Sequence, residues 1–328
     1  MPTNKKTQRV IPEILEGKTY LDPKYDPAFR ALFEREDALI DFLNGLLHLE
    51  KEKQIEHLEY TFADTLRFRM PEPKAVIFDI RAMTKDHRFL DIEMQRATHS
   101  FFTDRVLLYG SFLTIKGKQE LDKSPEFLAL SETERKEQRY KLPEIVAIWI
   151  CNFDSKAEHT KYRDSWAIHS ENDLSQGILT PVSDKMNYIM VNLPQFTKKR
   201  SELQSKEDVW LYLLVHAGEQ SEMPDFNDPV IDDALERIRV DSASDTLLEE
   251  QAKEMITQDE IDCRLAEGYL RGQELGMAKG MEKGLAKGLA KGEQKGKRDI
   301  ARKMLSGGLP LEKVLEFTGL SEEDAKNL

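Results

Sequence analysis

The amino-acid sequence predicts a mixed α/β core followed by an extended helical tail, and three observations lead to that prediction. Apolar patterns follow the order helix, strands, helix, buried strand and further helices up to about residue 220. Residues 145–150 are almost continuously apolar, which is typical of a strand buried on both faces. Glycine then recurs at every fourth position from 268 to 296. We therefore expect a core at 1–220, a helical linker and oligomerisation segment at 221–305, and a short helix-turn-helix-like end at 306–328.

The first expected element is a helix over residues 27–49. Pro27 suits the first turn of a helix, and Asp26 before it is a favoured N-cap. Apolar side chains then repeat at helical spacing and give one wide face for packing. They are Phe29, Leu32, Phe33, Leu39, Ile40, Leu43, Leu46 and Leu47.

The middle of the chain reads as the sheet and its covering helices. Alternating segments rich in β-branched and aromatic residues predict strands, and four-residue periodicity predicts helices. Strands are expected at 55–62, 75–81, 88–95, 143–153, 159–169 and 186–193. Helices are expected at 100–116, 207–217, 229–240 and from about 244 onward.

The tail carries three stripes at a spacing of four residues: glycine, lysine and an apolar residue. A spacing of four drifts by only about 40° per step around a helix, so each stripe spirals slowly. Eight interior glycines would cost a lone helix several kcal/mol, at roughly 1 kcal/mol each. A second helix that approaches along the glycine stripe would offset this cost, and a frayed, semi-disordered tether is the alternative. Residues 277–303 hold nine basic and three acidic residues, so this segment is positive.

The last 20 residues contain two short helical patterns, at 311–317 and 321–326. Gly307 and Gly308 end the long helix, and Gly319 lies in the turn between the two patterns. Ser321 and Asp324 have the spacing of a capping pair. A miniature helix-turn-helix and a helix pair that packs against a partner both remain open.

Composition bounds the class of protein. A formal charge of −12 argues against a protein that coats nucleic acid nonspecifically, although a local basic groove would still permit phosphate contact. No segment approaches the roughly 20 consecutive apolar residues of a membrane span, and residues 1–17 lack the apolar run of a signal peptide. Cys151 and Cys263 lie far apart and match no metal or redox spacing. We therefore expect a cytoplasmic protein without a membrane partner.

The strands at 75–81 and 88–95 form a predicted hairpin that carries the chemistry. Alternation places Val76, Phe78 and Ile80 on one face of the first strand, and a turn centred on Asp86 sets Asp79 opposite Glu93. Directly opposed carboxylates lie roughly 5 Å apart at Cβ and repel each other unless a cation lies between them. Mg²⁺ takes such oxygen ligands and acidifies a bound water. The alternative is an ordinary surface hairpin with a polar outer face.

Asp79, followed after a hairpin by Glu93-x-Gln95, resembles the signature of the PD-(D/E)XK nucleases. More narrowly, the chain resembles the Rpn-type recombination-promoting nucleases, which are also described as PD-(D/E)XK family transposases. The resemblance spans most of the chain, in the order of the family's motifs. The matching segments are Asp26-Pro27-Ala28-Phe29-Arg30-Ala31-Leu32-Phe33, Ile77-Phe78-Asp79-Ile80, Asp91-Ile92-Glu93-Met94-Gln95-Arg96, Phe101-Phe102-Thr103-Asp104-Arg105, Leu142-Pro143, the glycine-striped tail and Ile300-Ala301-Arg302-Lys303-Met304-Leu305.

The resemblance implies a restriction-endonuclease-like core and Mg²⁺-dependent cleavage of DNA, linked to recombination. Mn²⁺ or another divalent ion is an alternative cofactor. Residue by residue, it implies that Asp79 and Glu93 bind the metal and that Gln95 takes a catalytic position. Gln95 stands where the motif has lysine, and glutamine can orient water but cannot lend charge.

The resemblance also directs attention to residues around the hairpin. In such folds an acidic residue of the first helix often completes the metal site, and Asp26 or Glu34 would do so here. Arg96 or Arg105 would supply the missing positive charge, and Arg30 would contact the DNA backbone; each has an ordinary salt bridge or solvated charge as its alternative. Two other functions stay open: a noncatalytic oligomeric DNA-binding scaffold that retains the fold, and a true transposase.

Overall fold

The computed structural model describes residues 10–67, 75–98, 100–153 and 161–325. The chain divides into two compact units, Met1–Ile256 and Thr257–Leu328, and each is described by itself. Among the described residues, no helix combines the length and apolar character needed to cross a bilayer.

The first unit is built on a six-stranded mixed sheet with the order β1-β2-β3-β4-β6-β5. Strands β3, β4 and β6 run parallel, while β1 and β2 extend the sheet antiparallel on one side and β5 on the other. The central strand β4 is buried along nearly its whole length, as its apolar run predicts. The strands are β1 (Leu58–Arg67), β2 (Ala75–Thr84), β3 (Arg88–Gln95), β4 (Glu144–Cys151), β5 (Arg163–Trp166) and β6 (Met186–Asn192).

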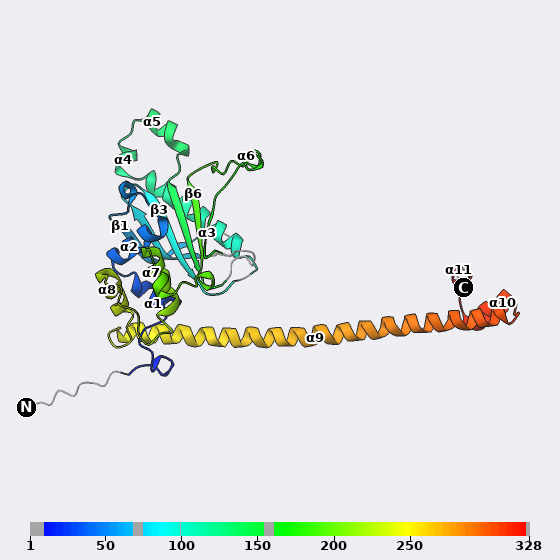
Figure 1. Ribbon diagram of the computed structural model, residues 1–328. Coiled ribbons are helices and arrows are strands. Elements are labelled where there is room, and N and C mark those ends of the chain that lie inside the picture. The colour runs from blue at the N-terminus through cyan, green and yellow to red at the C-terminus, as the bar shows by residue number, and fades with distance from the viewer. Residues whose placement is uncertain (1–9, 68–74, 99, 154–160, 326–328) are drawn as a thin grey trace, which may run out of the picture. The chain divides into compact units, whose positions relative to one another are not determined.

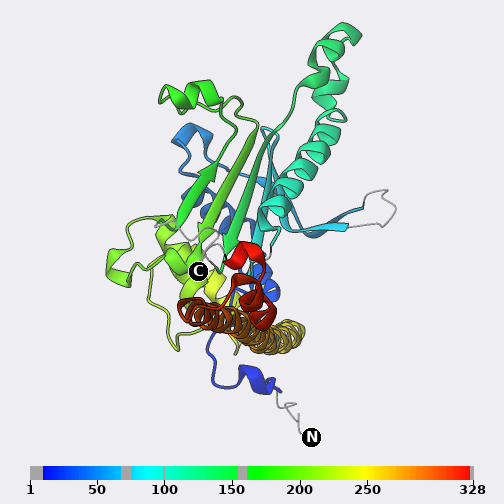
Figure 2. The same ribbon diagram turned by 90° about the vertical axis from the view of Figure 1, so that its right-hand side faces the viewer.

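Helices cover both faces of the sheet (Figures 1 and 2). Helix α3 packs on one face over an aromatic cluster that includes Phe89 and Trp149, while α1, α2, α7 and α8 bury the larger core of the other face. The described helices of the first unit are α1 (Asp26–Leu32), α2 (Glu36–Leu47), α3 (Phe102–Leu121), α4 (Pro125–Leu128), α5 (Glu132–Glu137), α6 (Glu171–Ser175), α7 (Lys206–His216) and α8 (Pro229–Arg237). The expected class, a mixed sheet flanked by helices and followed by a helical tail, is confirmed.

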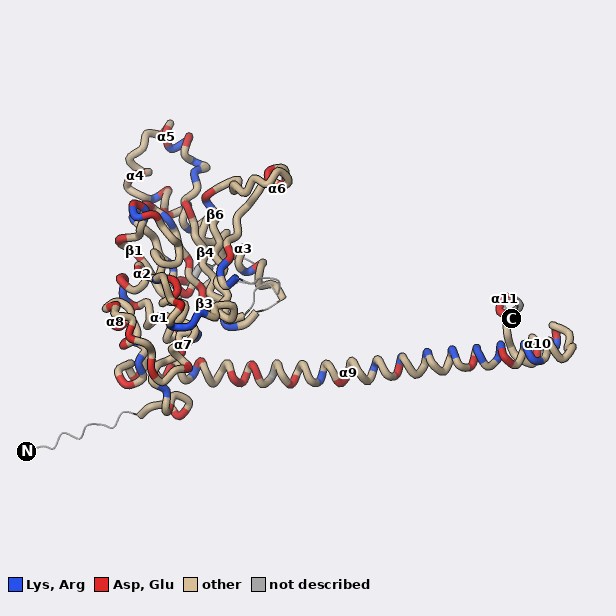
Figure 3. The backbone as a smooth tube through the Cα atoms, in the orientation of Figure 1, with Lys and Arg blue, Asp and Glu red and all other residues tan. Residues whose placement is uncertain are grey.

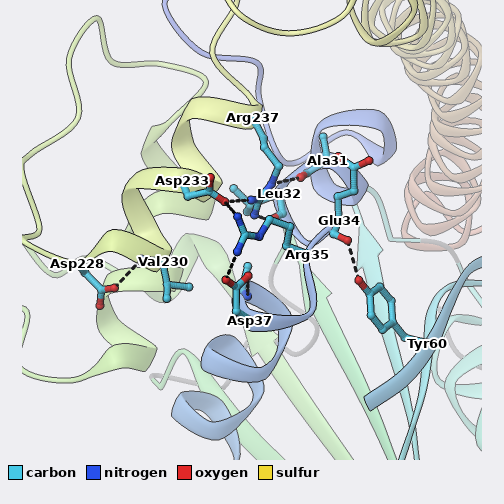
Figure 4. Close-up of polar contacts among 11 residues, drawn as sticks. Ala31, Leu32, Glu34, Arg35, Asp37, Tyr60, Asp228, Val230, Asp233 and Arg237 are labelled. Carbon is cyan, nitrogen blue, oxygen red and sulfur yellow. Dashed lines mark hydrogen bonds and ion pairs between the residues drawn. The ribbon is translucent and has the colours of Figure 1, made fainter. Parts of the chain in front are cut away.

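The first expected helix, 27–49, is in fact two helices that part after Leu32. Helix α8 stabilises this break, because the guanidinium of Arg237 donates to the carbonyl oxygens of Ala31 and Leu32 at 2.9 and 2.8 Å (Figure 4). These carbonyls lie at the C-terminal end of α1, where a helix leaves carbonyl oxygens without intrahelical donors. The continuous apolar pattern hid the break, since both helices bury their faces in the same core.

The compact core extends beyond the expected boundary near residue 220. Helix α8 and the first turns of α9 (Asp245–Ser306) contribute buried side chains, among them Leu248 and Met255. The buried Gln251 amide donates to the carbonyl of Asp22 and accepts the N–H of Ala28. The start of α9 thereby stabilises the beginning of α1.

The second unit contains the rest of α9, followed by α10 (Leu311–Thr318) and α11 (Glu322–Ala325). At each glycine from 268 to 296, an added Cβ would meet nothing within 4 Å. Ala301, Val314 and Leu320 form a small core where the short helices fold back. Gly319 ends α10 with a positive φ of 65°, which fits its predicted place in the turn.

Candidate metal and nucleic-acid site

The hairpin of β2 and β3 has the predicted register. Ile80 pairs with Ile92 and Met83 with Phe89, as a turn centred on Asp86 requires. The same register places Asp79 and Glu93 at the next step, where regular pairing stops.

At that step each carboxylate takes a backbone donor from the opposite strand. The N–H of Asp79 donates to Oε1 of Glu93 at 2.9 Å, and the N–H of Met94 donates to Oδ2 of Asp79, also at 2.9 Å. These side-chain contacts stand where ladder hydrogen bonds would otherwise continue. They hold both acids at one place between the strands.

The prediction that Phe78 and Ile80 share one apolar face is wrong. Phe78 belongs to the cluster beneath α3, with its ring 5.5 Å from that of Tyr109, whereas Ile80 belongs to the core of the opposite face. Strand alternation would put both on one side, so the backbone turns over between them. Ala63 lies between the β1 partners of these two residues and has a positive φ of 51°. The irregularity falls at Asp79 and frees it from the regular ladder.

The carboxyl groups of Asp26 on α1 and Asp79 on β2 interact electrostatically. Burial and then the nearby charge of Asp26 raise the pKa of Asp79 to about 7. Burial likewise raises the pKa of Asp26, against the opposing effects of Arg30, Arg105 and Arg96. The charge of Asp26 on α1 therefore acts on the carboxyl group of Asp79 on β2.

Asp91 is an acidic neighbour that the sequence analysis did not select. Its side chain is fully buried, and Glu93 is only 2% exposed. Neither oxygen of Asp91 accepts an N–H or hydroxyl from the described residues, so only the adjacent Glu93 carboxyl group, when protonated, can donate to it. Burial raises the pKa of Glu93 well above its usual value, and the nearby charges of Asp91 and then Asp79 raise it further. The two-residue spacing of Asp91 and Glu93 was the available signal, because it puts both on one face of a strand.

Gln95 and Arg105 form a direct contact at the end of β3. The Nη1 atom of Arg105 donates to Oε1 of Gln95 at 2.9 Å, and its Nη2 lies 3.8 Å from Oε2 of Glu93. Nη2 also donates to the hydroxyl of Tyr109, one turn along α3. A guanidinium thus lies at Gln95, close to the carboxylate of Glu93.

Arg30 and Arg96 lie near Asp26 at the start of α1. Nη2 of Arg30 is 3.5 Å from Oδ2 of Asp26, and the guanidinium of Arg96 stacks on the ring of Tyr25 at 3.6 Å. Nε of both arginines and Nη1 of Arg96 have no hydrogen-bond partner within the described part of the chain. All three arginines selected from the sequence act electrostatically on Asp26, and two of them, Arg30 and Arg96, have donors without a partner among the described residues.

Glu34, the alternative to Asp26, lies elsewhere. Its carbonyl oxygen accepts the hydroxyl of Tyr60 at 2.6 Å, next to β1 (Figure 4). Glu254, which the sequence analysis did not select, is much closer to the site: its Oε1 faces the N–H of Asp26 at 3.5 Å. Burial and then Asp26 raise the pKa of Glu254.

The carboxyl groups suit a hard divalent cation by their chemistry. Several acids here are buried or half-buried, and neighbouring acids raise the pKa of Asp79 and of Glu93. Both oxygens of Asp91 lack donors. A cation bound among these carboxyl groups would neutralise their charge. Over the described ranges, no three His, Cys, Asp or Glu side chains already surround a single point as a ready metal site.

Comparisons with known proteins point in the same direction. Residues 23–263 match the family described as PD-(D/E)XK nuclease family transposase. Residues 294–328 match the C-terminal helix-turn-helix domain of the Rpn/YhgA-like nuclease family, which favours the helix-turn-helix over a mere helix pair. No curated protein and no solved structure matches the chain.

Proposed function

Because the chain belongs to the PD-(D/E)XK nuclease family transposases, we propose that it is a Mg²⁺-dependent endonuclease that hydrolyses phosphodiester bonds in DNA. The observation that supports this most is the pair of hydrogen bonds at the end of the β2–β3 ladder, from the Asp79 N–H to Glu93 and from the Met94 N–H to Asp79, together with the charge of Asp26 acting on Asp79. Mn²⁺ is an alternative ion. We further propose a cytoplasmic role in recombination or mobile DNA.

In this proposal the acids hold the metal and fix its place. Asp79 and Glu93 are the principal ligands, and Asp26 reaches the same ion from α1. A bound divalent ion supplies an acidified water and neutralises charge on the phosphate. The backbone donors on Asp79 and Glu93 restrict the two carboxylates to a narrow range of orientations before the ion arrives.

Gln95 and Arg105 act together in place of the motif's lysine. The hydrogen bond from Arg105 fixes the orientation of the Gln95 side-chain amide. The hydrogen-bonding positions of this amide that remain free position water or phosphate. The guanidinium supplies the positive charge that glutamine lacks, close to where negative charge develops on the phosphate. This pairing accounts for a motif without lysine that still performs phosphodiester chemistry.

Nucleic-acid binding in this account uses two regions. Arg30, Arg96 and Arg105 contact the phosphates around the scissile bond, because the guanidinium group matches phosphate oxygens in charge and geometry. The helix-turn-helix domain at 294–328 contacts DNA independently of the core. The part of α9 that follows Ile256 joins two copies into a homo-oligomer, which suits cutting of both strands.

A plasmid-nicking assay with Mg²⁺ or Mn²⁺ tests the proposal. Wild type should convert supercoiled plasmid to nicked or linear DNA, while Asp79→Ala and Glu93→Ala should lose this activity. Glu59→Ala is the matched control, because it removes an exposed carboxylate from the adjacent strand β1. Equal cutting by wild type and Asp79→Ala would reject the assignment.

A noncatalytic DNA-binding scaffold is the second candidate. Gln95 in place of lysine and the net charge of −12 favour it. Plasmid binding without any metal-dependent nicking, unchanged in the Asp79→Ala variant, would support it over the enzyme. A strand-transfer assay on terminal-repeat substrates would separately identify a true transposase.

A further inference from the structure

The exposed part of α9 consists of two halves with opposite net charge (Figure 3). Residues 257–274 contain five acidic and two basic residues, whereas residues 275–306 contain nine basic and three acidic ones. The first half is therefore negative and the second strongly positive. The proposed nuclease chemistry uses neither half.

The same stretch also presents unpartnered apolar side chains. Between 65% and 78% of Leu265, Tyr269, Met277, Met281 and Leu285 is exposed. They follow one another at intervals of four or eight residues, adjacent to the glycine stripe, so they form a continuous apolar and small-residue surface. Exposed apolar surface of this length marks an interaction site.

We propose that the α9 helices of two copies of this chain pair antiparallel along this surface. The proposal rests on the self-association included in the proposed function and adds its direction. In a parallel pair, acidic half lies on acidic half and basic half on basic half, which is repulsive along the whole length. In an antiparallel pair, each acidic half meets the partner's basic half.

Individual residues fit this direction. An antiparallel pair centred on Glu282, near the midpoint of the glycine stripe, sets Asp262 opposite Arg302 of the second copy and Glu267 opposite Lys297. Arg271 then faces Glu293. The glycine positions of the middle section face one another, with Gly280 opposite Gly284 and Gly276 opposite Gly288, so the backbones can approach closely. The apolar positions beside them face lysines of the second copy, as Met281 does Lys283.

The four-residue period also predicts the hand of the pair. A hydrophobic repeat longer than 3.6 residues winds to the right around a straight α-helix, and the repeat here is four. The two helices therefore cross with a right hand, as helices do when small residues recur at this spacing.

The arrangement has a consequence for DNA recognition. Antiparallel pairing brings residues 307–328 of one copy beside the second copy's tail near Thr257, where that tail joins its own nuclease unit. The two helix-turn-helix domains thus lie at opposite ends of the paired helices.

Spin labels on the full-length protein test the direction directly. Cys263 is exposed and Cys151 is buried, so a Cys151→Ala variant takes a label at Cys263 alone. At a rise of 1.5 Å per residue, antiparallel pairing separates the two labels by about 57 Å. A second variant, Cys151→Ala/Cys263→Ser/Glu282→Cys, should give a separation within about 20 Å, because paired helices lie 8–10 Å apart. Short distances at both positions would show a parallel pair and overturn the proposal.

Charge reversal tests the physical cause. One variant carries Lys279→Glu, Lys283→Glu, Lys287→Glu, Lys291→Glu and Lys295→Glu, and the other carries Asp259→Lys, Glu260→Lys, Asp262→Lys and Glu267→Lys. Each should associate with itself at least tenfold more weakly than wild type in sedimentation equilibrium. An equimolar mixture should recover the wild-type affinity.

A wild-type protein that stays monomeric at every concentration would overturn the proposal. The proposal would also fail if both charge variants dimerised as wild type does, or if their mixture stayed monomeric. In that event, salt-sensitive loss of DNA binding in the lysine-reversed variant would assign the basic half to DNA. Neither measurement depends on cleavage, so failure of the nuclease assignment leaves this test unaffected.

Discussion

Glu93 accepts the backbone N–H of Asp79 in the position where a sheet hydrogen bond would otherwise form, and Asp79 accepts the N–H of Met94 in return. The two acids thereby replace a rung of the β2–β3 ladder. Burial raises the pKa of both carboxyl groups, helped by Asp26 at Asp79 and by Asp91 and Asp79 at Glu93, which costs stability when the acids are charged and no cation is present.

The first prediction concerns Asp79→Asn in metal-free buffer. The folded-state pKa of Asp79 is raised to about 7, so its contribution to stability is present below the unfolded pKa near 3.8 and is lost as the pH rises through 7. Asparagine stays neutral and still accepts from Met94. Above pH 7 the variant should be the more stable protein, by up to about 4 kcal/mol at roughly 1.4 kcal/mol per pKa unit.

Thermal melts from pH 4 to 8 in EDTA check this, with Glu59→Gln as the control at an exposed carboxylate. Added Mg²⁺ should raise the Tm of wild type and of the control but not that of Asp79→Asn. A constant difference between wild type and Asp79→Asn across the whole pH range would contradict the prediction.

The second prediction concerns Arg105. Removal of one preorganised donor near developing charge typically lowers kcat about 100-fold, and we expect that loss for Arg105→Ala. Arg105→Lys should retain part of the activity, because it keeps the charge but cannot reach Gln95 and Tyr109 together. Single-turnover nicking rates measure both, and Arg135→Ala on the exposed helix α5 is the control. Full activity of Arg105→Ala would remove Arg105 from the site.

The third prediction concerns the packing of α3 on the sheet. An added Cβ at Gly110 would lie 2.4 Å from the hydroxyl oxygen of Tyr188, which is buried. Gly110→Ala should destabilise the protein by about 1–3 kcal/mol through overpacking. Denaturant unfolding checks this against Ser111→Ala, at the neighbouring exposed position.

Tyr188→Val in the Gly110→Ala background should recover part of the loss, because the smaller side chain vacates the space. Strict additivity of the two substitutions would show that Gly110 and Tyr188 do not interact.

The fourth prediction concerns Asp64, which joins β1 to α3. Burial raises the pKa of its carboxyl group, but hydrogen bonds from Lys116 and Arg81 outweigh burial and leave the pKa below 3.8. The stabilisation is therefore complete above about pH 4 and is lost as the pH falls through the depressed pKa. Asp64→Asn should lower the Tm at pH 7, with the difference from wild type shrinking below pH 4. An equal difference at pH 3 and pH 7 would exclude the ionic contribution.

Much of the fold follows from local patterns in the sequence. The apolar run of β4, the register of the β2–β3 hairpin and the capping of the last helix by Ser321 could all be predicted, because each depends on neighbours in the chain. The break after Leu32 and the extent of the core could not. They depend on Arg237 and Gln251, which act over more than 200 residues of sequence.

The candidate site shows the same division. Asp79, Glu93 and Gln95 could be selected from strand alternation and the motif. Asp91 could be recognised only from the structure, because its burial and its lack of hydrogen-bond donors are three-dimensional properties. The contact of Arg105 with Gln95 likewise depends on how α3 crosses the end of β3.

Anomalous diffraction from a crystal soaked in Mn²⁺ tests the central claim most directly, because it locates the ion without reference to activity. We predict one strong peak at the end of the β2–β3 ladder, with oxygens of Asp79 and Glu93 about 2.2 Å from the ion and Asp26 in its coordination shell. The peak should vanish in crystals of Asp79→Ala. A soaked wild-type crystal with no peak there, or with the ion bound only at other acids, would contradict the account.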